Sequence, residues 1–418
     1  MRILITGASG FIGSALAAAF TDRGHAVVAC AHRRDPHAAA IRVDYLRDGE
    51  EADWLPRLHG VDAVINAVGI LRETGAARFD ALHQRAPVAL FRACQTAGVA
   101  RVIQISALGA DDSATSAYHR SKRAADDALR KLDLDWTILQ PSVVFGSGGA
   151  STGLFLRLAS LPVIPLIGAG DQCMQPIHID DLTALVVKLI EEGKGLRQTL
   201  HAVGPDAVTL RQMLRSYRSG MGLGQAVFLP TPLPLIRLAA KFGDVVKSGA
   251  LSTETLDMLL RGNTGDVHAV TALLGRAPRA VDDFIAPAER SLFRIHAVFH
   301  WLRPLLLGSI ALMWILAGIM SWLSAEQQGL ALLARLGLAP SMAQAAFVGA
   351  CLLNVGLGIA TLRPRRAVWA VQLAVITFYT ATLSYVAPQL WLDPFGPLLK
   401  NIPLATLIFG LMSLESAS

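Results

Sequence analysis

Cysteine is scarce in this chain, and its four copies show no pairing pattern. They lie far apart, at Cys30, Cys94, Cys173 and Cys351, and no histidine cluster accompanies them. Disulfide frameworks and zinc sites both need cysteines or histidines at short, regular spacings. The sequence therefore argues against a disulfide-stabilised secreted domain, predicts no metal site, and fits a reducing compartment.

Charged side chains are also few, and they are unevenly distributed. Of 418 residues, 17% are charged and 53% are hydrophobic, and the charges thin out after Arg303. The net charge of +6 is not gathered into a Lys/Arg cluster with interleaved aromatic residues, which argues against nucleic-acid binding. We expect a water-soluble part followed by a membrane part, with the lipid bilayer as a partner.

Near its start the chain has a glycine turn between an expected strand and an expected helix over residues 11–20. Gly7, Gly10 and Gly13 recur at three-residue spacing. Glycines let a ligand approach the backbone closely, and the helix N-terminus offers free N–H groups to a phosphate. The spacing differs from the G-x-G-x-x-G fingerprint. It predicts a dinucleotide cradle, and the alternative is a plain glycine-rich turn of an α/β protein.

The residues after the second expected strand, 26–31, bear on which nucleotide binds. Arg33 and Arg34 follow that strand. At this place in a dinucleotide fold, a carboxylate binds the ribose 2′-hydroxyl and arginine binds a 2′-phosphate. The arginines favour NADP over NAD, unless they belong to an ordinary surface loop. By analogy, Asp44 is expected at the adenine amino group.

Strands and helices alternate through the first part of the chain. Further strands are expected at 41–43, 63–66 and 101–106, and a helix at 76–97. This alternation requires parallel pairing with right-handed crossovers, so we predict an α/β Rossmann fold with a doubly wound parallel sheet. Ala67 and Val68, after the fourth strand, are expected beneath the adenosine ribose.

A tyrosine and a lysine follow the fifth strand, at the start of a helix expected to run to about residue 132. Tyr118 and Lys122 are four apart, so they lie on one helix face, one turn from each other. We expect the ammonium and the positive nicotinamide ring to lower the pKa of the tyrosine, which would exchange a proton with a substrate oxygen. Lys122 would also hold the nicotinamide ribose.

Four further stretches resemble the atypical short-chain dehydrogenase/reductases (SDR). They are residues 103–110, 118–122, 140–146 and 175–181, and the T-G-x-x-G-x-x-G turn is that family's own form. Over about residues 1–292 the chain is most similar to the branch with the NADPH-binding accessory subunit of respiratory complex I. The resemblance implies NADP as the cofactor, with NAD less favoured. Together with the residues already discussed, it implies a cofactor-binding set made up of Gly7, Ser9, Gly10, Phe11, Ile12, Gly13, Arg33, Arg34, Asp44, Ala67, Val68, Ser106, Tyr118, Lys122, Pro141 and Val143.

One departure from the family concerns catalysis. Enzymes of the wider superfamily carry a serine or threonine that polarises the substrate carbonyl, and its register falls here on Leu108. Losing one such donor costs about 2.7–4 kcal/mol of transition-state stabilisation. Ser106, at the end of the strand, could substitute or could contact only the cofactor. The candidate catalytic residues are therefore Tyr118, Lys122 and Ser106.

Residues 147–292 are expected to form the substrate-side subdomain. Asp180 and Asp181 are placed to cap a helix over 181–192 and to complement its dipole, and the alternative is a catalytic carboxylate. The stretches 154–166, 228–238 and 242–250 are apolar, and they would line a hydrophobic substrate pocket or rest on a bilayer surface.

Residues 293–418 resemble the DoxX-like four-helix membrane domains. The runs 304–323, 336–362 and 367–392 are uncharged and long enough to cross about 30 Å of hydrocarbon. A fourth run, 397–414, contains Lys400 and Pro403. Arginines gather before the first run and between the second and third. The positive-inside rule thus predicts a four-span inner-membrane protein with its nucleotide-binding domain and C-terminus in the cytoplasm.

Two functions remain open, and a third, a soluble nucleotide-sugar epimerase, is disfavoured by the apolar C-terminal part. The first is a membrane-anchored NADP-dependent oxidoreductase acting on a hydrophobic or membrane-derived substrate. The second is a non-catalytic NADPH-binding protein that serves as an assembly or sensor component with membrane-protein partner subunits.

Overall fold

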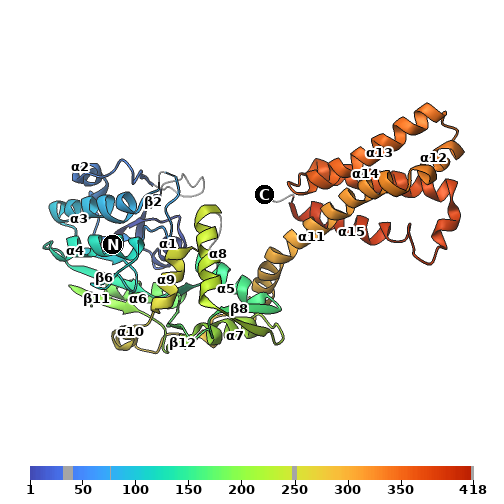
Figure 1. Ribbon diagram of the computed structural model, residues 1–418. Coiled ribbons are helices and arrows are strands. Elements are labelled where there is room, and N and C mark those ends of the chain that lie inside the picture. Colours follow the sequence, from blue (N-terminus) through green and yellow to red (C-terminus); the bar gives the residue numbers. More distant parts are fainter. Residues whose placement is uncertain (32–40, 76, 247–251, 416–418) are drawn as a thin grey trace. The chain divides into compact units, whose positions relative to one another are not determined.

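The computed structural model describes residues 1–31, 41–75, 77–246 and 252–415. It divides into two compact units, Met1–Val298 and Phe299–Ser418 (Figure 1). The first is an α/β unit and the second is helical. The long helix α11, Arg290–Ser324, begins in the first unit and continues without a break into the second.

Unit 1 is built on a seven-stranded sheet in the order β11-β6-β5-β4-β1-β2-β3, with every neighbouring pair parallel. The central strands are apolar and buried, as strands covered by helices on both faces require. The strand order reverses beside β1, which creates the switch point of a doubly wound sheet. The predicted fold class is confirmed, with strands β1 Arg2–Thr6, β2 Ala26–Ala31, β3 Ile41–Arg42, β4 Ala63–Asn66, β5 Arg101–Ile105, β6 Trp136–Pro141 and β11 Gln198–Ala202.

Helices cover both faces of this sheet. One face packs against Leu16, Phe20 and Leu182, and the other against Phe91 and Leu129, all without measurable solvent exposure. Each fully buried side chain of this size contributes about 1.5–3 kcal/mol to burial free energy. The helices are α1 Phe11–Asp22, α6 Ile179–Glu192 and α10 His268–Leu274 on the first face, and α2 Glu51–Trp54, η1 Leu55–Leu58, α3 Ala86–Ala97 and α4 Ala117–Arg130 on the second.

The helix expected over 76–97 differs from the prediction. Its helical part begins at Asp80, and its first segment, η2 (Asp80–Arg85), is a wider π-helical turn. Here the N–H of Ala86 bonds to Ala81 O, five residues back. Pro87 follows directly and has no N–H to donate to the preceding turn, so α-helical bonding cannot run unbroken across this junction.

The part of unit 1 that follows β6 has its own core around Phe145, Tyr217 and Phe284. Three two-stranded sheets and a set of helices surround that core. The elements are β7 Val144–Phe145, α5 Ala150–Ser160, β8 Val163–Ile167, β9 Cys173–Met174, β10 Ile177–His178, β12 Val208–Thr209, α7 Leu210–Gly220, β13 Val227–Thr231, α8 Leu233–Val246, α9 Thr253–Arg261 and η3 Val281–Asp283.

Asp180 and Asp181 do lie in the first turn of α6, where their charge complements the helix dipole, but the expectation that they cap the helix is wrong. His178 caps α6 instead, because its Nδ1 accepts the N–H of Asp180 at 3.2 Å. Asp181 is fully buried and accepts hydrogen bonds from the Arg276 guanidinium and, at 2.7 Å, from the N–H of Arg279. Its carboxylate therefore binds the returning chain, which sequence spacing does not reveal.

In unit 2 three helices are long and apolar enough to cross a membrane within the part of the chain that the structure describes. They are α11, α13 (Pro340–Thr361) and α14 (Arg366–Val386). The fourth expected span is shorter, because α15, Asn401–Leu414, has 14 residues and a length of about 21 Å. Pro403 in its first turn is compatible with a helix that begins at residue 401. The remaining elements are α12 Glu326–Arg335 and η4 Pro388–Trp391.

The helices of unit 2 pack through glycines and polar bonds. A Cβ on Gly358 would lie 2.7 Å from Ala311 O, so α11 and α13 approach closely. Gln372 Nε2 donates to Thr361 Oγ1 at 2.7 Å. Asn401 Nδ2 donates to Thr380 Oγ1 at 2.8 Å, which joins α15 to α14.

Candidate functional site

The glycine turn after β1 leaves no room for side chains. Gly7 has φ +69°, and a Cβ on it would lie 2.8 Å from Ala67 O. A Cβ on Gly13 would lie 2.1 Å from Gly7 O, so helix α1 rests directly on the turn. The N–H of Gly10 donates to Gly7 O at 2.8 Å, and the N–H of Gly7 donates to Tyr45 Oη at 3.1 Å. Glycine is thus required at positions 7 and 13 for steric reasons.

The start of helix α1 is open to a ligand. Ser9 and Gly10 are exposed, and among the described residues no side chain caps the helix at Gly10. The N–H groups of Phe11, Ile12 and Gly13, in the first turn, therefore remain available with the positive end of the helix dipole. This arrangement fits a diphosphate.

Lys122 lies between the ends of two strands. Its ammonium donates to Val68 O at 2.9 Å and to Ile105 O at 3.1 Å, and the residue is 3% exposed. Burial lowers the pKa of Lys122 to about 8. The two bonds fix this ammonium at the carboxyl edge of β4 and β5, beside the Ala67–Val68 turn.

Tyr118 is one turn before Lys122 on α4. Its ring stands edge-on to that of His83, with centroids 5.5 Å apart, and its N–H donates to Glu254 Oε1 at 2.9 Å. We expected Lys122 to lower its pKa. The structure differs: burial raises the pKa of Tyr118 to about 12, with a smaller contribution from Asp126. Desolvation of the phenolate outweighs an ammonium whose hydrogen bonds go to backbone carbonyls.

Ser106 is engaged with a carboxylate that the sequence did not single out. Its hydroxyl donates to Asp126 Oδ2 at 2.5 Å, and Asp126 is fully buried, one turn after Lys122. Burial raises the pKa of Asp126 to about 6. The hydroxyl hydrogen of Ser106 is therefore used inside the protein. Leu108 is 6% exposed, and its N–H donates to Pro141 O at 3.0 Å.

His83 is a second residue that sequence reasoning missed. Its Nε2 accepts the N–H of Ile70 at 2.9 Å, and its Nδ1 lies 2.8 Å from Ser121 Oγ. Burial, and then Lys122, lowers the pKa of His83 to about 2, so the ring is neutral. It connects the loop after β4 to helix α4. Only tertiary contacts reveal this role, and no motif in the sequence signals it.

A line of polar side chains crosses the buried ends of three strands. Thr6 Oγ1 donates to Asn66 Oδ1 at 2.6 Å, and Asn66 Nδ2 donates to Gln104 Oε1 at 2.7 Å. These residues are in register on β1, β4 and β5. The strand pairing predicted from sequence, combined with three polar residues at matching strand ends, could have found this line.

The remaining expected residues lie at the edges of this region. Arg33 and Arg34 fall outside the described residues. Asp44 is half-buried after β3 and accepts the N–H of Leu46 at 3.1 Å. Val143 O accepts the N–H of Ile177 at 3.0 Å, which ties the segment after Pro141 to β10.

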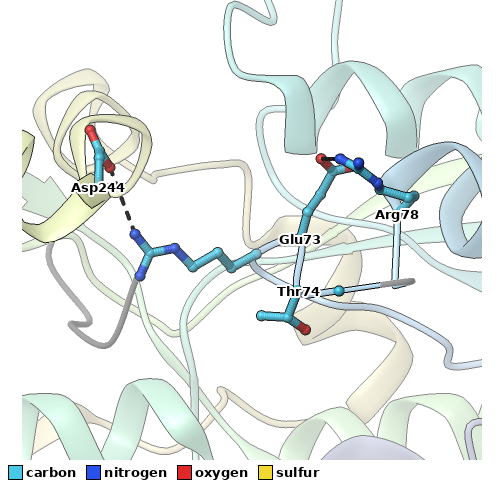
Figure 2. A pocket seen from close by; sticks show the side chains of 6 residues that line it. Glu73, Thr74, Arg78 and Asp244 are labelled. Carbon is cyan, nitrogen blue, oxygen red and sulfur yellow. Dashed lines mark hydrogen bonds and ion pairs between the residues drawn. The ribbon is translucent and has the colours of Figure 1, made fainter. Parts of the chain in front are cut away.

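Cavities lie near the site among the residues that the structure describes. One, of about 210 Å³, is lined by Leu108, Gly109, Asp111, Gln140, His201, Arg261, Gly262, Asn263 and Thr264. The other, of about 550 Å³, lies between the loop after β4 and helix α8 and is lined by Arg72, Glu73, Thr74, Gly75, Arg78 and Asp244 (Figure 2). In the second, Arg72 pairs with Asp244 at 3.7 Å and Arg78 pairs with Glu73 at 3.1 Å.

Comparison with known families identifies two segments of the chain. Residues 3–201 match the NAD dependent epimerase/dehydratase family, and residues 311–409 match the DoxX-like family. Both resemblances seen in the sequence are confirmed.

Curated relatives are similar to unit 1. The ceramide reductase of Caulobacter vibrioides is 29% identical over 55% of this chain and 74% of its own length. Subunit 9 of the NADH dehydrogenase (ubiquinone) 1 alpha subcomplex, mitochondrial, is 27% identical in Mus musculus, over 42% of this chain and 46% of the subunit. The Arabidopsis thaliana subunit is 30% identical over 36% of this chain and 39% of the subunit. The chain thus matches less than half of those two subunits.

Solved structures share the fold. UDP-glucuronic acid 4-epimerase from Bacillus cereus, in complex with UDP-glucuronic acid and NAD, has a TM-score of 0.53 at 19% identity. The match covers 70% of this chain and 99% of the epimerase. A nucleoside-diphosphate-sugar epimerase from Staphylococcus aureus has a TM-score of 0.55 at 16% identity, and the match covers 68% of this chain and 99% of the epimerase.

Proposed function

We propose that this chain, in which an SDR-like domain of the NAD-dependent epimerase/dehydratase type precedes a DoxX-like membrane domain, is a membrane-anchored NADP-dependent oxidoreductase. Its substrate is a hydrophobic, membrane-derived molecule. The observation that carries the proposal is the placement of Lys122: its ammonium is fixed by Val68 O and Ile105 O at the strand edge beside the glycine turn, one helical turn from Tyr118.

The residues fit a bound dinucleotide at three places. The uncapped N-terminus of α1 receives the diphosphate, and the Ala67–Val68 turn faces the adenosine ribose. Lys122 has three donor hydrogens and uses two on carbonyls, so one remains for a ribose hydroxyl. A nicotinamide cofactor supplies or accepts the hydride. Arg33 and Arg34 favour the 2′-phosphate of NADP.

Tyr118 is the proton donor in this proposal. With a pKa of about 12 its hydroxyl is protonated at neutral pH, so it donates a proton to a carbonyl oxygen as that oxygen gains negative charge. This favours the reducing direction. Since Leu108 has no hydroxyl and Ser106 donates to Asp126, Tyr118 alone polarises the carbonyl, and we expect slow turnover.

A hydrophobic substrate is supported by two features. The curated relative from Caulobacter vibrioides is named a ceramide reductase. The DoxX-like membrane domain keeps the nucleotide-binding unit beside lipid. We place the protein in the inner membrane, with the nucleotide-binding domain, residues 1–292, in the cytoplasm where NADPH is available.

A non-catalytic NADPH-binding component of a membrane assembly is the second candidate. It is favoured by the packing of the Tyr118 ring against Phe79, His83 and His119. It is also favoured by Leu108, which stands where enzymes of the wider superfamily carry a serine or threonine. The similarity to the NADH dehydrogenase subunit points to membrane-protein partner subunits for such a role.

Substrate-dependent turnover separates the two candidates. The full chain in lipid nanodiscs is mixed with NADPH and a long-chain keto-lipid, and the loss of nicotinamide absorbance is followed. The enzyme proposal expects NADPH oxidation that stops in Tyr118→Phe while NADPH binding, measured by calorimetry, stays unchanged. Full turnover in Tyr118→Phe would remove Tyr118 as the proton donor. NADPH binding without turnover on any keto-lipid supports the second candidate.

A further inference from the structure

The small sheet formed by β8 and β13 is apolar on its outer face as well as its inner face. Val227 pairs with Val163 and Leu229 pairs with Pro165 in the parallel register. These four residues are exposed, and Val227 is 63% exposed, whereas the intervening Ile164 and Leu166 are fully buried. A solvated sheet face normally alternates with polar residues outward. The outer face here does not follow that pattern.

Helix α8, which follows β13, continues this apolar exposure. Its inner side packs Ala240 against Ile167, at the end of β8. Its outer side carries Leu235, Leu238 and Phe242, which are 58%, 66% and 69% exposed. Residues at positions i, i+3 and i+7 share one helix face, so these three form a continuous stripe. We call the outer face of β8–β13 and this stripe the outer apolar surface.

The chain around this surface is strongly basic. Residues 207–243 contain no Asp or Glu, and their charged residues are Arg211, Arg215, Arg218, Arg237 and Lys241. On α8, Arg237 and Lys241 are exposed, and neither forms an ion pair with any residue that the structure describes. Apolar residues flanked by free cations are the composition of a helix that lies in the interface of an anionic bilayer.

This surface is covalently tethered to the membrane domain. Helix α11 begins in unit 1, where Leu292 and Ile295 are 50% and 61% exposed, and runs on into the membrane domain. A tethered surface meets the bilayer at high effective concentration, so weak contacts suffice to hold it there.

We propose that the outer apolar surface of unit 1 lies in the interface of an anionic lipid bilayer, with Leu235, Leu238 and Phe242 among the acyl chains and Arg237 and Lys241 at the lipid phosphates. The substrate-side subdomain then rests on the membrane. This docking does not depend on the proposed function, because it follows from the exposed residues of β8, β13 and α8.

The test uses the full chain in nanodiscs with a single environment-sensitive fluorophore. The exposed Cys173 is first replaced by serine, since the other three cysteines are buried. The fluorophore is attached at Leu238→Cys and, as a matched control, at Leu46→Cys, another exposed leucine of unit 1 that lies outside the surface. Quenching by nitroxide-labelled lipid is measured in phosphatidylcholine with and without phosphatidylglycerol.

We expect quenching at position 238 to exceed that at 46 several-fold, to rise with phosphatidylglycerol, and to fall in Arg237→Glu/Lys241→Glu. Equal quenching at the two positions overturns the docking. Quenching that ignores both phosphatidylglycerol and the double substitution overturns the role of the cations. If the emission of the fluorophore at 238 shows the same shielding from water in detergent as in nanodiscs, and nitroxide-labelled lipid does not quench it, then protein covers the surface. This outcome also overturns the proposal.

Discussion

The hydroxyl of Ser106, at the end of β5, donates a 2.5 Å hydrogen bond to Asp126, a carboxylate of helix α4 without solvent exposure. Burial raises the pKa of Asp126 from 3.8 to about 6, although Ser106 and Lys122 both favour its charged form. A buried carboxylate whose pKa is raised makes stability depend on pH, because the folded protein holds its proton at a higher pH than the unfolded chain.

We predict that the free energy of unfolding falls by roughly 3 kcal/mol as pH rises from about 3 to about 7 through this group alone, since the folded state binds more protons there. Asp126→Asn removes that decline. Urea unfolding of the full chain in detergent over this pH range measures it, with Asp112→Asn, a 96% exposed side chain, as the control. A decline that persists unchanged in Asp126→Asn would assign it to other groups.

The glycine turn gives a steric prediction. In Gly13→Ala the new Cβ meets Gly7 O at 2.1 Å, so the turn must move and the cradle is lost. We expect NADPH affinity to fall by at least about tenfold, which is about 1.4 kcal/mol. Gly49→Ala is the matched control, because no atom lies within 4 Å of its Cβ. Calorimetry measures both variants, and unchanged affinity in Gly13→Ala would remove the turn from the nucleotide site.

The preference for NADPH over NADH tests the role of the two arginines that follow β2 in the sequence. In Arg33→Ser/Arg34→Ser we expect NADPH affinity to fall about ten- to a hundredfold, since a hydrogen bond to a charged group contributes about 1.5–3 kcal/mol. NADH has no 2′-phosphate, so its affinity should not change. Titrating wild type and variant with both nucleotides gives the ratio. An equal loss for NADPH and NADH would point to a general effect on folding instead.

The strands, their parallel order and the position of Lys122 were predictable because each depends on local patterns: apolar runs, glycine turns and helical spacing. The hydrogen-bond partners of buried polar groups could not be predicted in this way. His83 contacts Ile70 and Ser121, and Asp181 contacts Arg276, pairs brought together only by the fold. Asp126 was missed for the same reason, although it continues the four-residue spacing of Tyr118 and Lys122.

Helix limits were harder to predict than helix positions. The turn at Asp80–Arg85 follows from Pro87, whose missing N–H acts on the preceding turn. Hydropathy also gave 397–414 as one run, whereas the helix occupies Asn401–Leu414. Composition sets which segments are apolar, and backbone hydrogen bonding decides where a helix begins.

An ion pair at the end of the short helix α15 indicates at which end of the helical bundle this helix finishes. Arg303, before the apolar run of α11, pairs with Glu415, at the end of α15, at 2.5 Å. Trp369, near the start of α14, also donates to Glu415, at 2.6 Å. The end of α15 therefore returns to the end of the bundle where α11 enters and α14 begins, as a fourth crossing requires.

We predict accordingly that a reporter fused after the C-terminus is active only in the cytoplasm. In a Cys173→Ser background, Gln328→Cys on α12 should react with an impermeant thiol reagent added outside intact cells. Arg365→Cys, between α13 and α14, should react only after the membrane is opened, because arginines favour the cytoplasmic side. Both positions are exposed, so accessibility reports their side of the membrane. A C-terminal reporter active outside, with Arg365→Cys still protected, would mean that α15 does not cross.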